Sequence, residues 1–506
     1  MQLPFYNLGD CLRLPALGDA EALVVLSADG AVLERLSAQA LDARIDAVAE
    51  RLLALGVASG DRALLLGQNS LPFLLGCLAL LRLGAVAVPL NPALPAAIRA
   101  HVVADAGCRW CLHEGDSALP ESGMAGISLD DAQLFAPPEA TPRLERFRPR
   151  PDDLALVLYT SGSTGMPKGV PLTHHGQCWA LSHYSADLES AAERQRIAIA
   201  TPLYHMNGFF LATMALSNRM VAHLLPRFDA ASWLRVIAEQ RIDYVTGVPT
   251  MFALAAQLPQ RPPVEQFEHV TDAFLGSSPV TDALVAQVAA LFPRARIRNS
   301  YGTTEAGPIV FRDHPQGLPR PPTSVGYPVD DIDWRFSNGS DTEGPLELRT
   351  PAVSPGYLNR PEATAKAFHD GWYRTGDIMR RDDNGFFYFV GREDDMFVCG
   401  GENIYPGQVE ALLERHPAIM QAAVIPMPHA TKGQAPAAFV VAAPGEILTE
   451  EAVKRFALEQ GPAFAHPRRV FILDALPLGG TRKVDKRALA ALLDDEKAEV
   501  AESSRG

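Results

Sequence analysis

The fold of this chain is decided by a strand-and-loop stretch, Tyr159-Thr160-Ser161-Gly162-Ser163-Thr164-Gly165-Met166-Pro167-Lys168-Gly169-Val170. In front of it runs Leu154-Ala155-Leu156-Val157-Leu158, a short apolar run that predicts a buried strand. Glycine permits backbone turns with positive φ, and successive N–H groups in such a turn form a concavity that binds anions. The hydroxyl side chains add donors, and Lys168 adds a mobile cation suited to phosphate. The stretch therefore predicts a loop that holds a polyphosphate.

Two other interpretations of this loop are weaker. A Walker A loop needs Gly, four residues and then Gly-Lys-Ser/Thr, whereas here Pro167 precedes Lys168 and Gly169 follows it. A flexible Ser/Gly linker is the second alternative, and the flanking strand and the embedded lysine count against it.

The order Thr-Ser-Gly-Ser-Thr-Gly-x-Pro-Lys-Gly resembles the phosphate loop of the adenylate-forming enzymes. These include acyl-CoA synthetases, the adenylation domains of peptide synthetases and luciferases. The resemblance covers nearly the whole chain, from Leu36 to Leu489. It implies that the loop binds ATP through Thr160, Ser161, Gly162, Ser163, Thr164, Gly165 and Lys168.

A second motif is Ser300-Tyr301-Gly302-Thr303-Thr304-Glu305-Ala306-Gly307-Pro308, which follows a predicted strand. An acidic residue in a turn at a strand end suits Mg²⁺, because this ion prefers one or two carboxylates together with phosphate oxygens. A plain turn with an exposed glutamate is the alternative. The segment resembles the family's aromatic-Gly-x-Thr-Glu motif. The match implies that Tyr301 stacks on adenine, Thr304 contacts phosphate and Glu305 holds Mg²⁺, with Gly302 and Thr303 beside the nucleotide.

Other segments match the nucleotide site of the family. Asp377, at the end of Gly371-Trp372-Tyr373-Arg374-Thr375-Gly376-Asp377, would accept the ribose hydroxyls, as acidic residues do in other nucleotide sites. An ordinary turn residue is the alternative for Asp377. Arg392 would contact ribose or phosphate. The adenine-side loop of the family is matched by Gly276, Ser277, Ser278 and Pro279.

The segment from Gly391 to Pro406 is the densest match, and it lies where the predicted elements change in character. Its alternative interpretation is a charged linker followed by a hairpin turn. By the resemblance, Asp394 is the hinge of a small mobile domain, and Gly400 and Gly401 line the pantetheine tunnel. The tunnel residues implied in this way are Gly400, Gly401, Glu402, Phe464 and His466.

Lys483 lies on a glycine loop near the end of the chain. Taken alone, it would be a solvated surface group. In the family, a lysine in this place reaches the reacting carboxylate and the α-phosphate. A mobile cation there offsets the repulsion between two anions and stabilises charge as the new bond forms.

The segment from Pro202 to Phe210 matches the place where a histidine or aromatic residue gates the acyl pocket. His205 is the implied gate, and a packed core histidine is the alternative. The predicted lining is apolar and contains no further cation, which disfavours a dicarboxylate such as malonate and leaves an aryl or medium-length aliphatic acid. The pocket residues implied by the resemblance are His205, Met206, Phe209, Val248, Gly276, Gly302, Gly307 and Pro308.

Within the family, the chain looks most like bacterial aryl-CoA ligases of the 4-chlorobenzoate:CoA ligase type. It departs from them at two positions near the CoA nucleotide. Lys432 stands where those ligases carry a tryptophan, and His466 stands in place of an arginine. The contacts to the CoA adenine therefore differ, with Arg468 and Arg469 as candidates for its phosphates.

The bulk properties agree with a large enzyme. The chain has 506 residues, of which 47% are hydrophobic, so more than one domain and a large core are expected. The net charge of −14 argues against a nucleic-acid surface. Six cysteines, with one isolated pair at Cys108 and Cys111, indicate neither a disulfide scaffold nor a complete zinc site. No signal peptide or membrane span is evident, so we expect a cytoplasmic location.

Alternating strands and helices predict an α/β fold with largely parallel sheets. We expect a large adenylation domain over residues 1–393, built of parallel sheets flanked by helices with a small β-barrel-like subdomain. A small mobile α+β domain over 394–495 and a disordered acidic tail over 496–506 would follow. Residues 137–151, rich in proline and charge, predict a linker into the phosphate loop.

The predicted activity is that of an ATP-dependent acid:CoA ligase, an AMP-forming acid–thiol ligase. The carboxylate attacks Mg·ATP to give acyl-AMP and pyrophosphate, and the CoA thiol then attacks the adenylate. Positioning and charge stabilisation do this work without a side-chain nucleophile.

Three alternatives stay open. One is a ligase that loads a carrier-protein thiol. Another is a non-catalytic nucleotide-binding protein, which the presence of Glu305 and Lys483 disfavours. A luciferase-like oxygenase is the third, although nothing in the sequence signals oxygen chemistry. The expected partners are a carboxylic acid, ATP and CoA, and a homodimer is left open beside a monomer.

Overall fold

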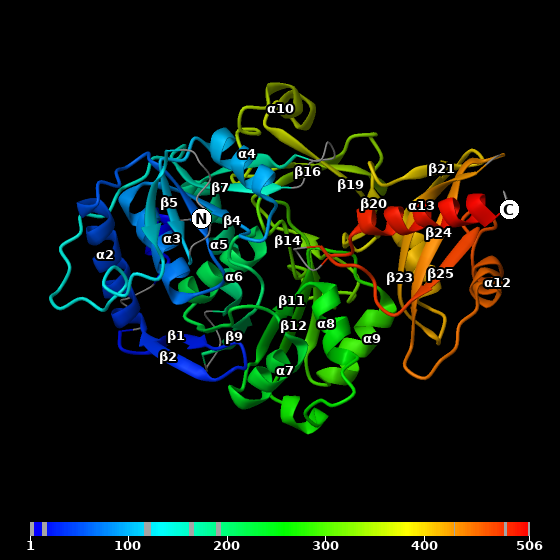
Figure 1. Ribbon diagram of the computed structural model, residues 1–506, viewed down its shortest axis with the longest axis horizontal. Coiled ribbons are helices and arrows are strands. Elements are labelled where there is room, and N and C mark those ends of the chain that lie inside the picture. The colour runs from blue at the N-terminus through cyan, green and yellow to red at the C-terminus, as the bar shows by residue number, and fades with distance from the viewer. Residues whose placement is uncertain are drawn as a thin grey trace.

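The computed structural model of the chain describes residues 5–12, 18–115, 123–160, 166–188, 194–429, 431–479 and 483–503. Figure 1 shows a large N-terminal part, coloured from blue to yellow, and a smaller C-terminal part in orange and red. The strands of the N-terminal part form two large sheets and a smaller antiparallel sheet, and the C-terminal part has a sheet of its own.

The first large sheet has the strand order β6-β5-β3-β4-β7-β8. Its strands are parallel except β8, which runs antiparallel to β7. The strands are β3 (Arg62–Leu66), β4 (Val86–Leu90), β5 (Trp110–His113), β6 (Ala125–Ser128), β7 (Leu154–Thr160) and β8 (Lys168–Thr173). The helices in this region are α2 (Ala38–Ala54), α3 (Leu71–Leu83) and α4 (Ala96–Ala106).

The second large sheet has the order β13-β12-β11-β9-β10-β1-β2, and only the β1–β2 pair is antiparallel within it. The strands are β1 (Glu21–Leu26), β2 (Val32–Ser37), β9 (Arg196–Ile199), β10 (Val221–Leu224), β11 (Tyr244–Gly247), β12 (Asp272–Gly276) and β13 (Arg296–Ser300). The helical elements here are η1 (Leu8–Asp10), α5 (His174–Leu188), α6 (Met206–Ser217), α7 (Ala230–Glu239), α8 (Pro249–Ala256), η2 (Val264–Phe267) and α9 (Asp282–Leu291).

An antiparallel sheet with its own apolar core follows. It contains β16 (Asp333–Phe336), β17 (Glu343–Arg349), β18 (Phe368–His369), β19 (Trp372–Arg381) and β20 (Phe387–Arg392). The pair β14 (Phe311–Arg312) and β15 (Tyr327–Pro328) and the helix α10 (Pro361–Ala367) complete this region.

The C-terminal sheet has the order β22-β21-β24-β23, with β25 added parallel to β24. The elements are β21 (Phe397–Cys399), β22 (Glu402–Ile404), α11 (Pro406–Leu413), β23 (Ile419–His429), β24 (Gly433–Ala442), α12 (Glu450–Gln460), β25 (Arg469–Leu473) and α13 (Lys486–Ser503). Its two faces carry separate apolar clusters. One includes residues of α11 and α12, and the other includes Leu489 and Leu493 of α13.

The helix α13 differs from the expected disordered tail, because it runs to Ser503. Leu489 and Leu493 anchor its first turns in the core, and the chain continues as a helix into the acidic end. The acidic composition of the C-terminal end did not reveal that α13 begins as a helix packed against the core.

Local signals in the sequence explain where the first helices begin and end. The hydroxyl of Ser37 accepts a hydrogen bond from the Ala40 N–H at the start of α2, and Ser70 does the same for Phe73 at the start of α3. Gly84 ends α3 in the left-handed conformation, with φ of 75°. These three residues therefore set the boundaries of the first helices.

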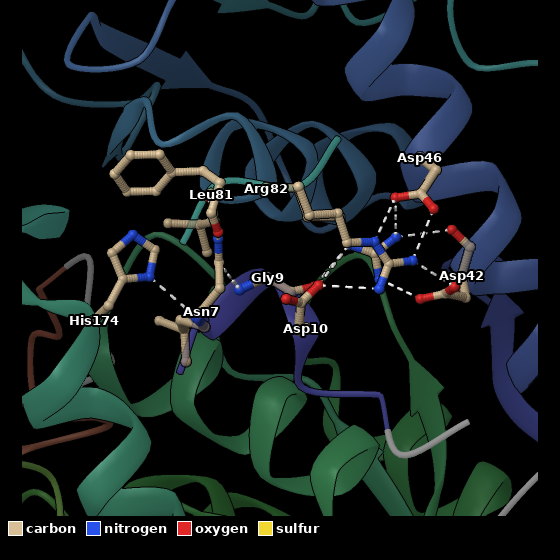
Figure 2. Close-up of polar contacts among 11 residues, drawn as sticks. Asn7, Gly9, Asp10, Asp42, Asp46, Leu81, Arg82 and His174 are labelled. Carbon is tan, nitrogen blue, oxygen red and sulfur yellow. Dashed lines mark hydrogen bonds and ion pairs between the residues drawn. The ribbon is translucent and has the colours of Figure 1, made fainter. Parts of the chain in front are cut away.

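A buried ion-pair network fastens the first helices together, as Figure 2 shows. The guanidinium of Arg82 on α3 is fully buried and pairs with Asp42 and Asp46 of α2, the latter at 2.7 Å. Arg146 lies 2.6 Å from Asp42 and 3.1 Å from Asp10 of η1. The predicted linker over residues 137–151 thus forms no helix or strand, yet Arg146 anchors it to the core.

Candidate active site

The predicted phosphate loop lies between two paired strands. β7 ends at Thr160, β8 begins at Lys168, and these two residues are register partners across the antiparallel pair. The loop therefore connects the two strands of a β-hairpin. This hairpin was not predicted from the sequence, because β8 was not recognised as a strand. The five predicted residues Ser161, Gly162, Ser163, Thr164 and Gly165 lie outside the described residues.

Lys168 and Glu305 both contact the side chain of Tyr357. The Lys168 Nζ lies 4.9 Å from the centroid of the Tyr357 ring, and the Tyr357 hydroxyl donates to Glu305 Oε1 at 3.1 Å. Tyr373 also donates to the Glu305 carboxylate. Sequence reasoning missed both tyrosines as site residues, since neither has a neighbouring pattern that points to this carboxylate.

Glu305 is 9% exposed, and burial raises the pKa of its carboxyl, although the two tyrosine hydroxyls act in the opposite direction. No arginine or lysine forms an ion pair with Glu305 within the part of the chain that the structure describes. This buried carboxylate therefore suits a cation that arrives with the substrate.

The turn that carries Glu305 is closed by its own backbone. Thr303 and Gly307 exchange two N–H···O=C hydrogen bonds of 3.0 Å, and the Ala306 N–H donates to the Thr303 hydroxyl. The position of Gly302 admits no side chain, because a Cβ there would stand 2.2 Å from the Pro308 oxygen. The predicted residues Gly302, Thr303, Thr304, Glu305, Gly307 and Pro308 thus form one rigid turn after β13.

The predicted ribose and adenine residues lie side by side. The Tyr301 hydroxyl donates to Asp377 Oδ2, and Arg392 Nη1 lies 2.9 Å from Asp377 Oδ1. Asp377 and Arg392 are register partners of β19 and β20, which explains why residues fifteen positions apart meet. Burial raises the pKa of Asp377, whereas the charge of Arg392 lowers it.

The predicted hinge is part of the same chain of contacts. Arg392 Nε lies 2.8 Å from Asp394 Oδ1, so Arg392 links the ribose-binding candidate to the start of the small domain. Next to Asp394, Asp395 forms an ion pair with Lys486 of α13 at 2.7 Å.

Lys483 faces the large domain. Its side chain is exposed to solvent. Desolvation by the surrounding protein nevertheless lowers the pKa of its ammonium group. The negative charge of Asp377 raises this pKa, and the positive charge of Arg392 lowers it. The positive charge of Lys483 also acts on His205. The predicted lysine of the small domain and three predicted residues of the large domain are therefore brought to one place.

His205 precedes α6, and its Nε2 has no hydrogen-bond partner among the described residues. Burial, together with the charge of Lys483, lowers the pKa of His205 to about 4, so the imidazole is neutral at pH 7. Asn207, in the first turn of α6, contacts the Ser277 hydroxyl at 3.4 Å. The predicted acyl segment and the adenine-side loop are thus neighbours.

The predicted pocket residues do not all share one core. Phe209 is buried in the first core cluster, and Met206 packs against it. Val248, which precedes α8, belongs to a second cluster around Trp233. Gly276 ends β12, and a Cβ there would stand 2.2 Å from the Ser300 hydroxyl on β13. Because β11, β12 and β13 are adjacent parallel strands, the residues that end or follow them meet at one edge of the sheet.

The predicted CoA loop is the tight turn of the hairpin β21–β22. A hairpin turn was also part of the alternative interpretation of this segment. Gly400 and Gly401 have φ values of 63° and 95°, a region that favours glycine. Gly400 N–H donates to the Lys432 carbonyl at 3.1 Å. A Cβ at Gly401 would meet nothing within 4 Å among the described residues, so this position of the turn is open.

The comparisons with known proteins agree with this geometry. The family model described as AMP-binding enzyme matches residues 16–358, and the model of the AMP-binding enzyme C-terminal domain matches residues 408–483. A feruloyl-CoA synthase from Amycolatopsis sp. is 31% identical over 458 residues, which cover 88% of this chain and 91% of that relative.

Solved structures show the same fold. ATP-bound MatB from Rhodopseudomonas palustris has a TM-score of 0.84 and 29% identity, with 96% of this chain and 98% of that chain covered. MenE from Bacillus subtilis, an O-succinylbenzoate coenzyme A synthetase, was solved with ATP and a magnesium ion. It has a TM-score of 0.79 and 27% identity, with 94% and 98% covered.

The chain belongs to the AMP-binding enzyme family and, within it, to the adenylate-forming acyl-CoA synthetases. Among the described residues, the helices include none that combines the length and the apolar character needed to cross a membrane.

Proposed function

We propose that this protein activates an aromatic or medium-chain carboxylic acid with ATP and transfers the acyl group to coenzyme A. One observation carries the proposal. Lys483 of the small domain acts electrostatically on His205 and on the Asp377–Arg392 pair of the large domain. A cation at the meeting point of the predicted acyl and ribose sites suits the joining of a carboxylate to an α-phosphate.

In the first half-reaction, a carboxylate oxygen attacks the α-phosphorus of ATP. The bond from this phosphorus to the bridging oxygen breaks, and pyrophosphate leaves with the electron pair. Lys483 offsets the negative charge of both reactants, Asp377 orients the ribose, and Lys168 with the hairpin loop holds the phosphates. These preorganised charges stabilise the transition state without a covalent enzyme intermediate.

Glu305 fits a Mg²⁺ ion that accompanies ATP. Its carboxylate is buried and has no cationic partner in contact within the described residues, and its pKa is raised. When bound, Mg²⁺ supplies positive charge to the phosphate oxygens. Tyr357 and Tyr373 hold the carboxylate in place by donating hydrogen bonds to it, and Thr304 lies next to it in the turn for a phosphate contact.

In the second half-reaction, the CoA sulfur attacks the acyl carbon of the adenylate. The bond from this carbon to the phosphate oxygen breaks, AMP leaves with the electron pair, and the thiol proton passes to solvent. Gly400 and Gly401 offer a backbone without side chains for the pantetheine arm. Since Lys483 lies within electrostatic range of Asp377 and Arg392 in the observed pose, and Gly401 stands in open space, we infer that the small domain turns near Asp394 between the two steps.

The acid is proposed from the lining of the pocket. His205 is neutral, Phe209 is buried and apolar, and the positive charge beside His205 is Lys483, which the reacting carboxylate uses. A second carboxylate would then lack a cation. The feruloyl-CoA synthase among the relatives acts, by its name, on an aromatic acid, which also supports this class.

The test is pyrophosphate release over a panel of carboxylic acids with ATP and CoA. We expect turnover of benzoate-like or medium-chain acids and almost none of malonate or succinate. Efficient use of malonate would contradict the proposed pocket. A parallel reaction with a phosphopantetheinylated carrier protein in place of CoA distinguishes the alternative thiol acceptor.

A further inference from the structure

The strands on either side of the predicted phosphate loop are held by other segments. On β7, the Tyr159 hydroxyl donates to Asp105 Oδ2 of α4 at 2.9 Å. On β8, the Gly169 carbonyl accepts from the Leu358 N–H at 2.8 Å. The Asn359 amide joins these two supports by donating to the Asp105 carbonyl at 2.7 Å. Both flanks of the loop are therefore fastened where α4 meets the start of α10, and Figure 1 shows these two helices as neighbours.

His101 lies one turn before Asp105 on the same face of α4. Its Nε2 lies 3.3 Å from the carbonyl oxygen of Pro167, the residue that precedes Lys168. This carbonyl belongs to the planar peptide group that ends in the Lys168 N–H. A hydrogen bond to it therefore fixes the direction in which the chain enters Lys168.

Arg360 reaches the same ring nitrogen. Its Nη2 lies 3.3 Å from His101 Nε2, just before α10 begins. A guanidinium donates only, whereas an imidazole nitrogen donates when it carries a proton and accepts when it does not. The Nε2 atom therefore serves either the Pro167 carbonyl or Arg360, and the two contacts exclude each other.

The contact with Pro167 is the one that bears on the phosphates. The Lys168 side chain has a fixed neighbour, because its Nζ lies 4.9 Å from the centroid of the Tyr357 ring. Tyr357 in turn donates to Glu305, the proposed magnesium ligand. Lysine is a point charge on a flexible stem, so its contribution to phosphate binding depends on how well its backbone is held beforehand.

We infer that His101 is a positioning residue for ATP, whose Nε2–H donates to the Pro167 carbonyl and thereby holds Lys168 in place for the phosphates. This inference rests on the proposed function, in which Lys168 holds those phosphates. Arg360 is half-buried, so its guanidinium can turn to water when Nε2 donates to Pro167. The role of His101 is thus indirect, because it acts through the peptide group before Lys168.

The variants separate the hydrogen bond from the bulk of the ring. Glutamine carries its amide nitrogen as many bonds from Cα as the Nε2 of histidine, whereas asparagine is one bond shorter and ends where Nδ1 stands. His101→Gln therefore keeps a donor within reach of Pro167, while His101→Asn and His101→Leu do not. The matched control is His269→Leu, because His269 is also half-buried and its Nε2 lies 3.0 Å from a carbonyl, that of Ile237 on α7.

Calorimetry of Mg·ATP binding without a carboxylic acid gives the Kd of ATP, and pyrophosphate release gives the KM of ATP and that of the acid. We expect His101→Leu and His101→Asn to raise the Kd and KM of ATP by about threefold to tenfold, as the loss of one hydrogen bond does, with the KM of the acid within about twofold of the parent. For His101→Gln and His269→Leu, the Kd of ATP should also stay within about twofold of the parent.

A double-mutant cycle shows whether His101 acts through Lys168. Lys168→Ala should weaken ATP binding more than His101→Leu does. His101→Leu added to Lys168→Ala should then change the Kd by less than about twofold, since the group that His101 positions is gone. Arg360→Met should leave the Kd of ATP unchanged or lower it, because it removes the competitor for Nε2.

The inference is overturned if His101→Leu binds ATP as the parent does, if His101→Gln loses as much affinity as His101→Leu, or if the two effects in the cycle are additive. A loss in Arg360→Met as large as in His101→Leu also overturns it, because the guanidinium then acts on the phosphates directly. If Lys168→Ala itself leaves ATP binding unchanged, the proposed phosphate contact fails together with the inference. If Lys168→Ala weakens binding while His101→Leu does not, the phosphate contact stands and the inference alone fails.

Discussion

Glu305 shows how one residue depends on segments far away in the sequence. Its backbone carbonyl accepts a hydrogen bond from Ser354 N–H at 2.7 Å, and its carboxylate accepts from Tyr357. Residues 354–357 thus hydrogen-bond to both the backbone and the side chain of Glu305. A carboxylate fixed in this way presents its remaining lone pairs in one direction, which is what a metal bound through phosphate requires.

A substitution of Glu305 by glutamine tests the metal role. Glu305→Gln removes the charge and keeps the shape and the hydrogen bond from Tyr357, so the fold should stay intact. We expect a higher Mg²⁺ requirement and slower formation of acyl-AMP, measured by Mg²⁺ titration of the first half-reaction. Glu362→Gln on the exposed start of α10 is the control and should match the parent. Identical titrations for Glu305→Gln and the parent would exclude Glu305 as the ligand.

At the scale of elements, the packing of α2, α3 and η1 depends on charge as well as apolar contact. Arg82 has an exposed fraction of 0%, and its guanidinium reaches Asp10, Asp42 and Asp46. Asn7 adds two hydrogen bonds of 2.9 Å, to the carbonyls of Leu81 and Phe147. Because the partners lie on η1, α2, α3 and the segment around Phe147, this network sets how the first segments of the chain join (Figure 2).

We expect Arg82→Met to lower the free energy of unfolding by about 3–5 kcal/mol, because it removes the fully buried one of the two guanidinium groups that pair with Asp10, Asp42 and Asp46. Urea unfolding followed by tryptophan fluorescence measures this change. The control is Arg109→Met, which removes an exposed pair with Asp61 and should change stability by about 0–1 kcal/mol. Equal effects of the two substitutions would show that the network does not stabilise the fold.

The sequence predicted the α/β fold with largely parallel sheets from its alternating strands and helices, and the two large sheets confirm it. It did not predict β8, whose apolar residues follow a loop that was interpreted through its phosphate chemistry alone. It also gave no sign of Tyr357, because the role of this residue depends on a contact with Glu305, 52 residues away in the sequence. Motif residues such as Asp377 and Arg392 were assigned by resemblance, and the pairing of β19 with β20 shows why they meet.

At the scale of the whole molecule, the relation of the two domains determines which step the site can perform. In the observed pose, Lys483 acts electrostatically on residues of the large domain, while a Cβ at Gly401 would meet nothing within 4 Å among the described residues. Figure 1 shows that the segment between β25 and α13 runs back toward the large N-terminal part before α13 begins. We therefore propose that this pose serves acyl-AMP formation and that thioester formation uses a second arrangement of the small domain.

Single-turnover kinetics of each half-reaction test this account most directly. Lys483→Ala should slow acyl-AMP formation by about 10²- to 10³-fold, as loss of one transition-state donor does, yet convert supplied acyl-AMP to thioester at nearly the parent rate. Gly401→Leu should form acyl-AMP normally and fail in thioester formation. Gly445→Leu, at another glycine of the small domain with positive φ and open space, controls for backbone strain and should affect neither step. If Lys483→Ala and Gly401→Leu each slow both half-reactions equally, the small domain does not alternate between two poses and the account is contradicted.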